Sequence, residues 1–92
     1  MKRIYKYQLA VAEEQVLEVP AGAEFIRLDG IDGKLWVWAL VDPNEQEFAC
    51  RRLLAFKTGG DIPDSVTSAE YIGCAAIFIQ MELMLYFFEV AA

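Results

Sequence analysis

The apolar run Leu35–Val41 is the segment around which the rest of the pattern is arranged. Turn-forming residues bound it, Gly33-Lys34 before it and Asp42-Pro43 after it. Seven consecutive apolar residues with two tryptophans and two valines are typical of a strand that is apolar on both faces. We therefore expect a central strand in the interior of a sheet. Its two faces would carry Leu35, Val37, Ala39 and Val41 on one side and Trp36, Trp38 and Leu40 on the other.

The chain begins with two short predicted strands. Lys2–Leu9 alternates, with Tyr5, Tyr7 and Leu9 on one side, which predicts a half-buried strand near a sheet edge, where lysines discourage aggregation. Gln15–Val19 is the second predicted strand. It ends at Pro20-Ala21-Gly22, a combination that favours a turn.

A tight hairpin is predicted just before the central strand. Glu24–Leu28 has strand character, and Asp29–Gly33 contains two aspartate-glycine type pairs that tolerate the positive φ of such turns. The same segment is too short for a calcium-binding loop and lacks the later glutamate of an EF-hand. We therefore expect a plain hairpin and no metal.

Residues 42–56 carry conflicting signals. Asp42-Pro43 followed by Glu45 could begin a helix. However, Phe48, Cys50, Leu54 and Phe56 fall on one side at period two, with Arg52 as the exception. We therefore predict a turn at 42–46 and a strand at 47–56, with a helix over 43–56 as the alternative.

The last third of the chain predicts a loop followed by two strands. Residues 57–64 form the longest polar, glycine-bearing break, and 65–69 reads as a connector. The apolar stretch from Tyr71 to Val90 is too long for one strand in a small domain, so it is divided at Gln80–Glu82. A helix over 68–76 is the alternative here.

Together these elements predict an all-β fold in a single globular domain of residues 1–92. The architecture is a small antiparallel meander that forms a sandwich or a partly open barrel of six to seven strands, with at most one short helix. No cofactor is implied by any motif. Cys50 and Cys74 lie far apart within apolar runs, so buried free thiols are expected, with one disulfide as the alternative.

Composition narrows the functional classes. The apolar fraction is 57%, above the usual range, and this surplus favours a homo-oligomer or a surface covered by a partner. The net charge of −6 disfavours direct binding of nucleic acid and suits a basic groove on another protein. The chain has no histidine, the usual general base near neutral pH, so we do not expect an enzyme. The absence of an unbroken apolar span predicts no membrane segment and a cytoplasmic location.

Eight residues are candidates for ligand or partner binding. An aromatic platform with nearby donors would suit an anionic ligand. Paired glycines can also direct backbone N–H groups at an anion, although a loop between strands is the plainer interpretation. Tryptophans at period two on a central strand are more often part of the core than a ligand platform, and Arg51 or Arg52 could be structural. The candidates are Trp36, Trp38, Arg51, Arg52, Thr58, Gly59, Gly60 and Asp61.

Several segments, in this order, resemble a family of short uncharacterised proteins encoded by tailed bacteriophages and prophages. They are Met1–Tyr7, the Trp-Ala-Leu-Val-Asp-Pro ending of Leu35–Pro43, the loop Thr58–Asp64, Tyr71–Gly73 and the terminal Phe-Phe-Glu at 87–89. The resemblance implies an accessory gene product in the host bacterial cytoplasm, with no established active site. It also implies a glycine near the last hairpin, where this chain has Gln80-Met81-Glu82.

Three functional hypotheses follow. The first is a phage-encoded protein that binds and inhibits a host defence or regulatory protein through an acidic, aromatic surface. The second is an oligomeric sponge that sequesters a small anionic nucleotide signal between the tryptophans and the arginine and loop donors. The third is a virion assembly component.

Overall fold

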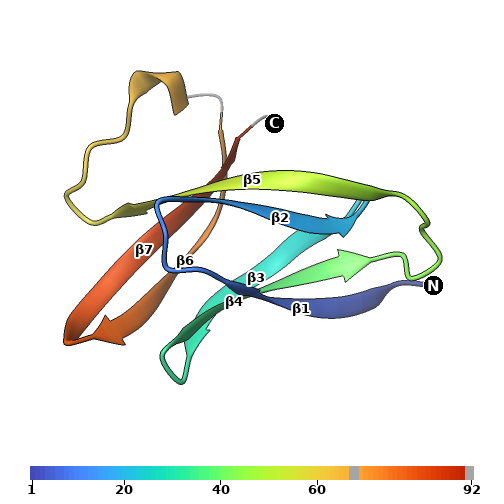
Figure 1. Cartoon of the computed structure of the whole chain (residues 1–92), viewed down its shortest axis with the longest axis horizontal. Helices are drawn as coiled ribbons and strands as arrows, with labels where there is room; N and C mark the ends of the chain where they lie inside the picture. Colours follow the sequence, from blue (N-terminus) through green and yellow to red (C-terminus); the bar gives the residue numbers. More distant parts are fainter. Residues whose placement is uncertain (67–68, 91–92) are drawn as a thin grey trace.

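The computed structural model describes residues 1–66 and 69–90, and in this part of the chain the fold is all-β (Figure 1). Its described strands number seven, and one short 3₁₀ helix, η1, spans Asp64–Val66. The strands are β1 Arg3–Leu9, β2 Glu14–Pro20, β3 Glu24–Ile31, β4 Lys34–Val41, β5 Phe48–Lys57, β6 Glu70–Ile79 and β7 Met81–Val90.

Two antiparallel sheets pack against each other, which confirms the predicted sandwich. One sheet has three strands in the order β1-β4-β3, and the other has four in the order β2-β5-β7-β6. Consecutive strands pair, as in a meander, in the hairpins β3–β4 and β6–β7. The remaining pairs, β1 with β4, β2 with β5 and β5 with β7, join strands that are not consecutive in the chain.

Strand β4 lies in the middle of its sheet, as predicted, but its two faces have different environments. Leu35, Val37, Ala39 and Val41 are fully buried between the sheets. Trp36 and Trp38 point to the opposite side and are only half-buried. The expectation that both indoles lie in the interior is therefore wrong, because a sandwich buries only one face of each sheet.

Both predicted hairpins are confirmed. Asp32 and Gly33 connect β3 to β4 with φ values of 53° and 76°, which suit the tight turn expected from this aspartate-glycine pair. Gln80 connects β6 to β7 with a φ of 63°. This left-handed conformation favours glycine, the residue that the family resemblance implied near this turn.

Residues 48–57 form strand β5, so the predicted strand is confirmed over the helix, but the face chosen from the sequence is wrong. Leu53 and Ala55 point into the core, whereas Phe48 and Cys50 are exposed on the outer side. Apolar residues occupy both sides of β5, because the loop after the strand covers part of its outer side. Alternation alone therefore could not identify the buried face.

One side of the sandwich is closed by a close approach of β3 and β6, the neighbouring edges of the two sheets. A Cβ atom built on Gly30 would lie 2.0 Å from the carbonyl oxygen of Ala76, and one on Gly73 would lie 3.4 Å from the Cβ of Leu28. The two strands therefore run side by side in the same direction. The core between the sheets includes Leu35, Leu53 and Phe87, all at most 1% exposed.

The C-terminal third also agrees with the two-strand prediction. Residues 70–76 belong to β6, which excludes the alternative helix over them, whereas Ser68 lies outside the described residues. Both cysteines are in strands and free, but both are exposed, so the prediction of buried thiols is wrong. Each lies on the outer side of the four-stranded sheet. Among the residues that the structure describes, no helix is long and apolar enough to cross a membrane.

Candidate functional site

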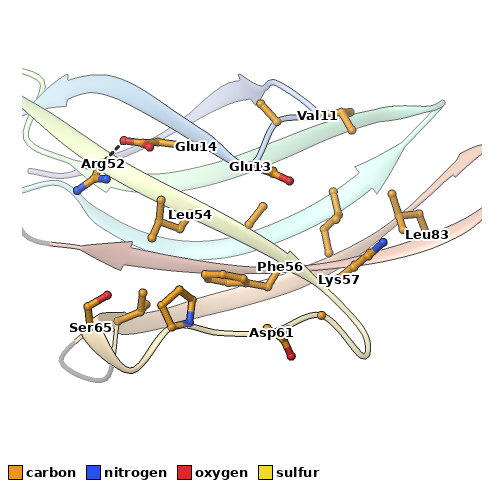
Figure 2. Close-up of a pocket in the computed structure, with 16 residues that line it drawn as sticks. Val11, Glu13, Glu14, Arg52, Leu54, Phe56, Lys57, Asp61, Ser65 and Leu83 are labelled. Atoms are coloured by element: carbon orange, nitrogen blue, oxygen red, sulfur yellow. Dashed lines mark hydrogen bonds and ion pairs between the residues drawn. The ribbon is translucent and has the colours of Figure 1, made fainter.

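A pocket of about 730 Å³ lies where the 58–66 loop folds back beside β5 (Figure 2). Figure 2 shows Leu54 and Phe56 between the strand and the part of the loop that carries Asp61 and Ser65. The corner between β1 and β2 closes another side, through residues that include Val11 and Glu13, and β7 contributes Leu83 and Leu85. The pocket is thus built by three separate stretches of the chain, which lie within residues 11–14, 52–66 and 83–85.

Charged groups at this pocket do not favour an anion. Arg52 donates a hydrogen bond to the Glu14 carboxylate, which occupies its guanidinium. That bond lowers the pKa of Glu14 below its ordinary value of 4.5. Glu13 and Asp61 are further carboxylates in the lining, against the single ammonium of Lys57. A free anion would therefore meet more negative than positive charge here.

The paired glycines form a turn rather than an anion cradle. The N–H of Gly60 donates to the carbonyl oxygen of Lys57 at 2.9 Å, so this donor is already used within the loop. Gly59 has a φ of 81°, which only glycine adopts at little cost. The Thr58 hydroxyl lies 3.2 Å from the Tyr86 hydroxyl. These contacts agree with the plainer interpretation of the segment as a loop between strands.

Arg51 has a structural environment. Its guanidinium pairs with Glu89, with one of the two contacts at 2.7 Å, and also donates to the carbonyl oxygen of Ala23 at 2.7 Å. It lies 4.6 Å from the centroid of the Phe25 ring. The hydrogen bonds to Glu89 raise the pKa of Arg51 above its ordinary value. Arg51 thus joins β5, β7 and the beginning of β3 between the sheets.

The tryptophans form a separate feature on the outer side of the three-stranded sheet. The Lys6 ammonium lies 4.1 Å from the centroid of Trp36 and 5.6 Å from that of Trp38. On the other side of β4, the Arg27 guanidinium lies 4.7 Å from the Trp38 centroid. We refer to Lys6, Arg27, Lys34, Trp36 and Trp38 as the indole face.

Exposed apolar side chains gather at one end of the sandwich. In the turn of the β6–β7 hairpin, Phe78 is 70% exposed, Ile79 51% and Met81 69%. Ile31, 37% exposed, ends β3, which runs beside β6, so both hairpins turn at the same end of the molecule (Figure 1). We refer to Ile31, Phe78, Ile79 and Met81 as the hairpin end.

The structure therefore brings together only some of the eight residues singled out from the sequence. Arg52, Gly60 and Asp61 line the pocket, while Thr58 and Gly59 lie in the adjoining turn. Arg51 lies between the sheets, and the tryptophans lie on the other sheet. Sequence reasoning missed Lys6 and Arg27. The sequence predicts a strand that contains Lys6, but the pairing of that strand with β4 cannot be read from local spacing.

The described residues contain no group of three histidine, cysteine, aspartate or glutamate side chains that could hold a metal ion. Neither a curated protein nor a solved structure matches the chain. A family model does match it over residues 1–92, under the description "domain of unknown function (DUF7352)". The chain therefore belongs to the DUF7352 family.

Proposed function

We propose that this chain is a non-enzymatic phage or prophage accessory protein that binds and inhibits a host defence or regulatory protein. The observation that carries the proposal is the hairpin end. Its four side chains are large and apolar, and three of them are at least half exposed. Several large apolar side chains exposed at one end of a small protein are typical of an interaction site.

The position of these residues supports a role in contact rather than in folding. Phe78 and Met81 lie next to the turn of a hairpin, beyond the buried positions Ala75 and Ile77 on β6 and Leu85 on β7. Polar residues there would leave the core unchanged and would lower the risk of aggregation. An apolar turn that projects from the body of the sandwich is suited to insertion into an apolar pocket of a partner.

Charge indicates the chemistry of that partner. The chain carries a net charge of −6, so its field attracts proteins with basic surfaces and repels acidic ones. The expected partner surface is an apolar pocket within a basic region, such as the ligand groove of a protein that itself binds nucleic acid. Occupying such a groove would inhibit that protein by direct competition with its ligand.

The test begins with the full-length chain immobilised and exposed to host lysate. The expected result is one host protein retained in stoichiometric amount, whose purified form then binds the chain in calorimetry and loses activity when it does. The double variant Phe78→Ser with Met81→Ser should abolish both binding and inhibition, because it removes the apolar anchors.

Val16→Ser is the matched control, because Val16 is 61% exposed on β2, outside the hairpin end. It should bind and inhibit as the unmodified chain does. Equal loss in the control and the double variant, or binding without inhibition, would contradict the proposal. Recovery of the chain as a stoichiometric component of purified phage particles would replace it with a role in virion assembly.

A further inference from the structure

We infer that the indole face is a binding site for a small planar anion of the nucleoside monophosphate class. The inference goes beyond the proposed protein contact, because the indole face lies on the outer side of the three-stranded sheet and does not include the hairpin end.

The first argument is the arrangement of the side chains. Register pairs Lys6 and Arg27 with Trp38 from opposite sides of β4. A bulge in β3 between Phe25 and Arg27 turns Arg27 to the outer side, so that it meets the indole instead of the core. Trp38 is thus flanked by a cation on each side, whereas Trp36 has Lys6 on one side and pairs in register with Asp29 on the other. A cation beside an aromatic ring can recognise a planar group and an anionic group together.

The second argument is the charge that remains free. Arg27 pairs with Asp29 at 2.7 Å, so its positive charge is already compensated. Lys6 and Lys34 take part in none of the ion pairs found among residues 1–66 and 69–90. Lys34 lies two residues before Trp36, on the same side of β4. The uncompensated Lys6 ammonium therefore lies over the Trp36 ring, and Lys34 adds a second ammonium to the same face of β4, in a chain whose net charge is −6.

The third argument is that a stacked ligand would cover apolar surface of the two indoles that is exposed to solvent. Trp36 and Trp38 are half-buried, although the other face of β4 supplies the core. A stacked base would cover the exposed part of an indole, and the flexible Lys6 side chain would turn from the ring to the phosphate. Base–aromatic stacking contributes about 1–3 kcal/mol per base, and a lysine–phosphate contact adds a charge-assisted hydrogen bond.

The size of the expected ligand follows from the charge of the whole chain. A polyanion would meet repulsion from the remainder of the molecule, which carries most of the 14 acidic residues. A ligand with a single phosphate avoids most of this cost, because Lys6 and Lys34 suffice to balance it. A mononucleotide therefore fits the indole face better than a nucleic-acid strand.

Intrinsic fluorescence tests the site directly, because the only two tryptophans of the chain are Trp36 and Trp38. Titration with adenosine or guanosine 5′-monophosphate should give saturable quenching, after correction for absorbance. Inorganic phosphate alone should give none, since it lacks a stacking group. The parent nucleoside should bind about tenfold more weakly than the monophosphate, since it lacks the charged contact.

Two variants distinguish binding at the indole face from a general effect of the charge of the chain. Lys6→Gln should weaken monophosphate binding about tenfold. Lys57→Gln removes the same charge from an exposed residue at the end of β5 and should leave binding unchanged. Equal thermal midpoints for the two variants would show that Lys6 acts on the ligand rather than on the fold.

Three outcomes would overturn the inference. They are the absence of saturable quenching by either monophosphate, equal weakening by Lys6→Gln and Lys57→Gln, and tighter, strongly salt-dependent binding of a single-stranded oligonucleotide. The last outcome would assign the surface to nucleic acid. Failure of any of these tests leaves the host-protein experiment unaffected, because that experiment depends on Phe78 and Met81.

Discussion

Gly30 shows how a single residue can permit two sheets to meet. Its α-carbon lies against the backbone of β6, and any side chain would collide with the carbonyl oxygen of Ala76. The required property is the absence of a Cβ rather than an unusual backbone angle. From the sequence, the same glycine belongs to an aspartate-glycine pair that predicts a hairpin turn, because local spacing carries no information about a strand in the opposite sheet.

Gly30→Ala should destabilise the fold by about 2–3 kcal/mol, since the backbone of β6 must shift to make room. Denaturant unfolding would measure the loss. Gly33→Asn is the matched control: a Cβ there meets nothing within 4 Å, and asparagine tolerates the left-handed conformation. A similar loss of stability in both variants would contradict the proposed close contact.

Arg51 and Arg52 are neighbours in the sequence with opposite roles in the structure. The side chains of the Arg51–Glu89 pair are 21% and 16% exposed, whereas those of the Arg52–Glu14 pair are 42% and 53% exposed. Strand alternation places one arginine between the sheets and the other at the surface. Because exposed ion pairs contribute little to stability, only Arg51 has a structural role.

Arg51→Ala should therefore lower the free energy of unfolding by about 2 kcal/mol, because it leaves the Glu89 carboxylate half-buried without its partner. Arg52→Ala should leave the thermal midpoint nearly unchanged. Thermal unfolding followed by circular dichroism compares the two. A larger loss for Arg52→Ala than for Arg51→Ala would reverse the assignment of the two faces of β5.

At the scale of elements, the β6–β7 hairpin combines a tight turn with an exposed apolar end. Ile79 and Met81 pair directly across Gln80, so a single residue reverses the chain. Gln80 holds a φ of 63°, which costs an L-residue with a side chain about 1–2 kcal/mol. The hairpin therefore forms because the paired strands behind it offset this cost.

Gln80→Gly should stabilise the hairpin by roughly 0.5–1 kcal/mol, because glycine adopts the left-handed conformation without strain but loses more chain entropy on folding. The change should appear in thermal unfolding and should leave host-protein binding intact, since no apolar side chain of the hairpin end is altered. A clear loss of stability would show that Gln80 does not adopt the left-handed conformation in solution.

Strand bulges explain why regular alternation describes only part of each sheet. The irregularity between Phe25 and Arg27 allows Phe25 and Leu28, three positions apart, to pack against the same core. A second one lies between Tyr71 and Gly73, where β6 passes close to β3. A bulge adds one residue to one strand and so reverses which side chains point inward.

At the scale of the whole molecule, acid should weaken the fold through its paired carboxylates. A hydrogen bond from Arg52 lowers the pKa of Glu14 below 4.5, and hydrogen bonds from Arg27 and the Gly30 N–H lower the pKa of Asp29 below 3.8. Groups with a lowered folded-state pKa stabilise the native state above their ordinary pKa. Their contribution is lost as the pH falls through the lowered value.

The thermal midpoint should accordingly be flat near neutral pH and should fall only slightly between about pH 5 and about pH 2, because both ion pairs are exposed and each contributes little to stability. Asp29→Asn should reduce the size of this fall, because it removes one of the groups that must be protonated. Thermal scans of both proteins over this pH range would test it. A midpoint that rises on acidification, or a variant with an undiminished fall, would contradict the linkage.

Amino-acid patterning was sufficient for the class of fold and for most element positions. The apolar run Leu35–Val41 predicts a strand in the middle of a sheet. Turns are predicted by backbone preferences that act locally, at Asp32-Gly33 and at Pro20-Ala21-Gly22. The split of residues 71–90 into two strands likewise follows from length. These predictions succeeded because each depends on interactions between residues close in the chain.

Pairing between strands that are distant in the sequence decided the remaining features of the structure. Which side of β5 is buried, where the tryptophans point and which arginine is structural all depend on how two sheets stack and on where a loop lies. The indole face exists only because two registers and a bulge bring Lys6 and Arg27 to the same tryptophan. No local preference encodes these contacts, since they join residues that lie more than ten positions apart in the sequence.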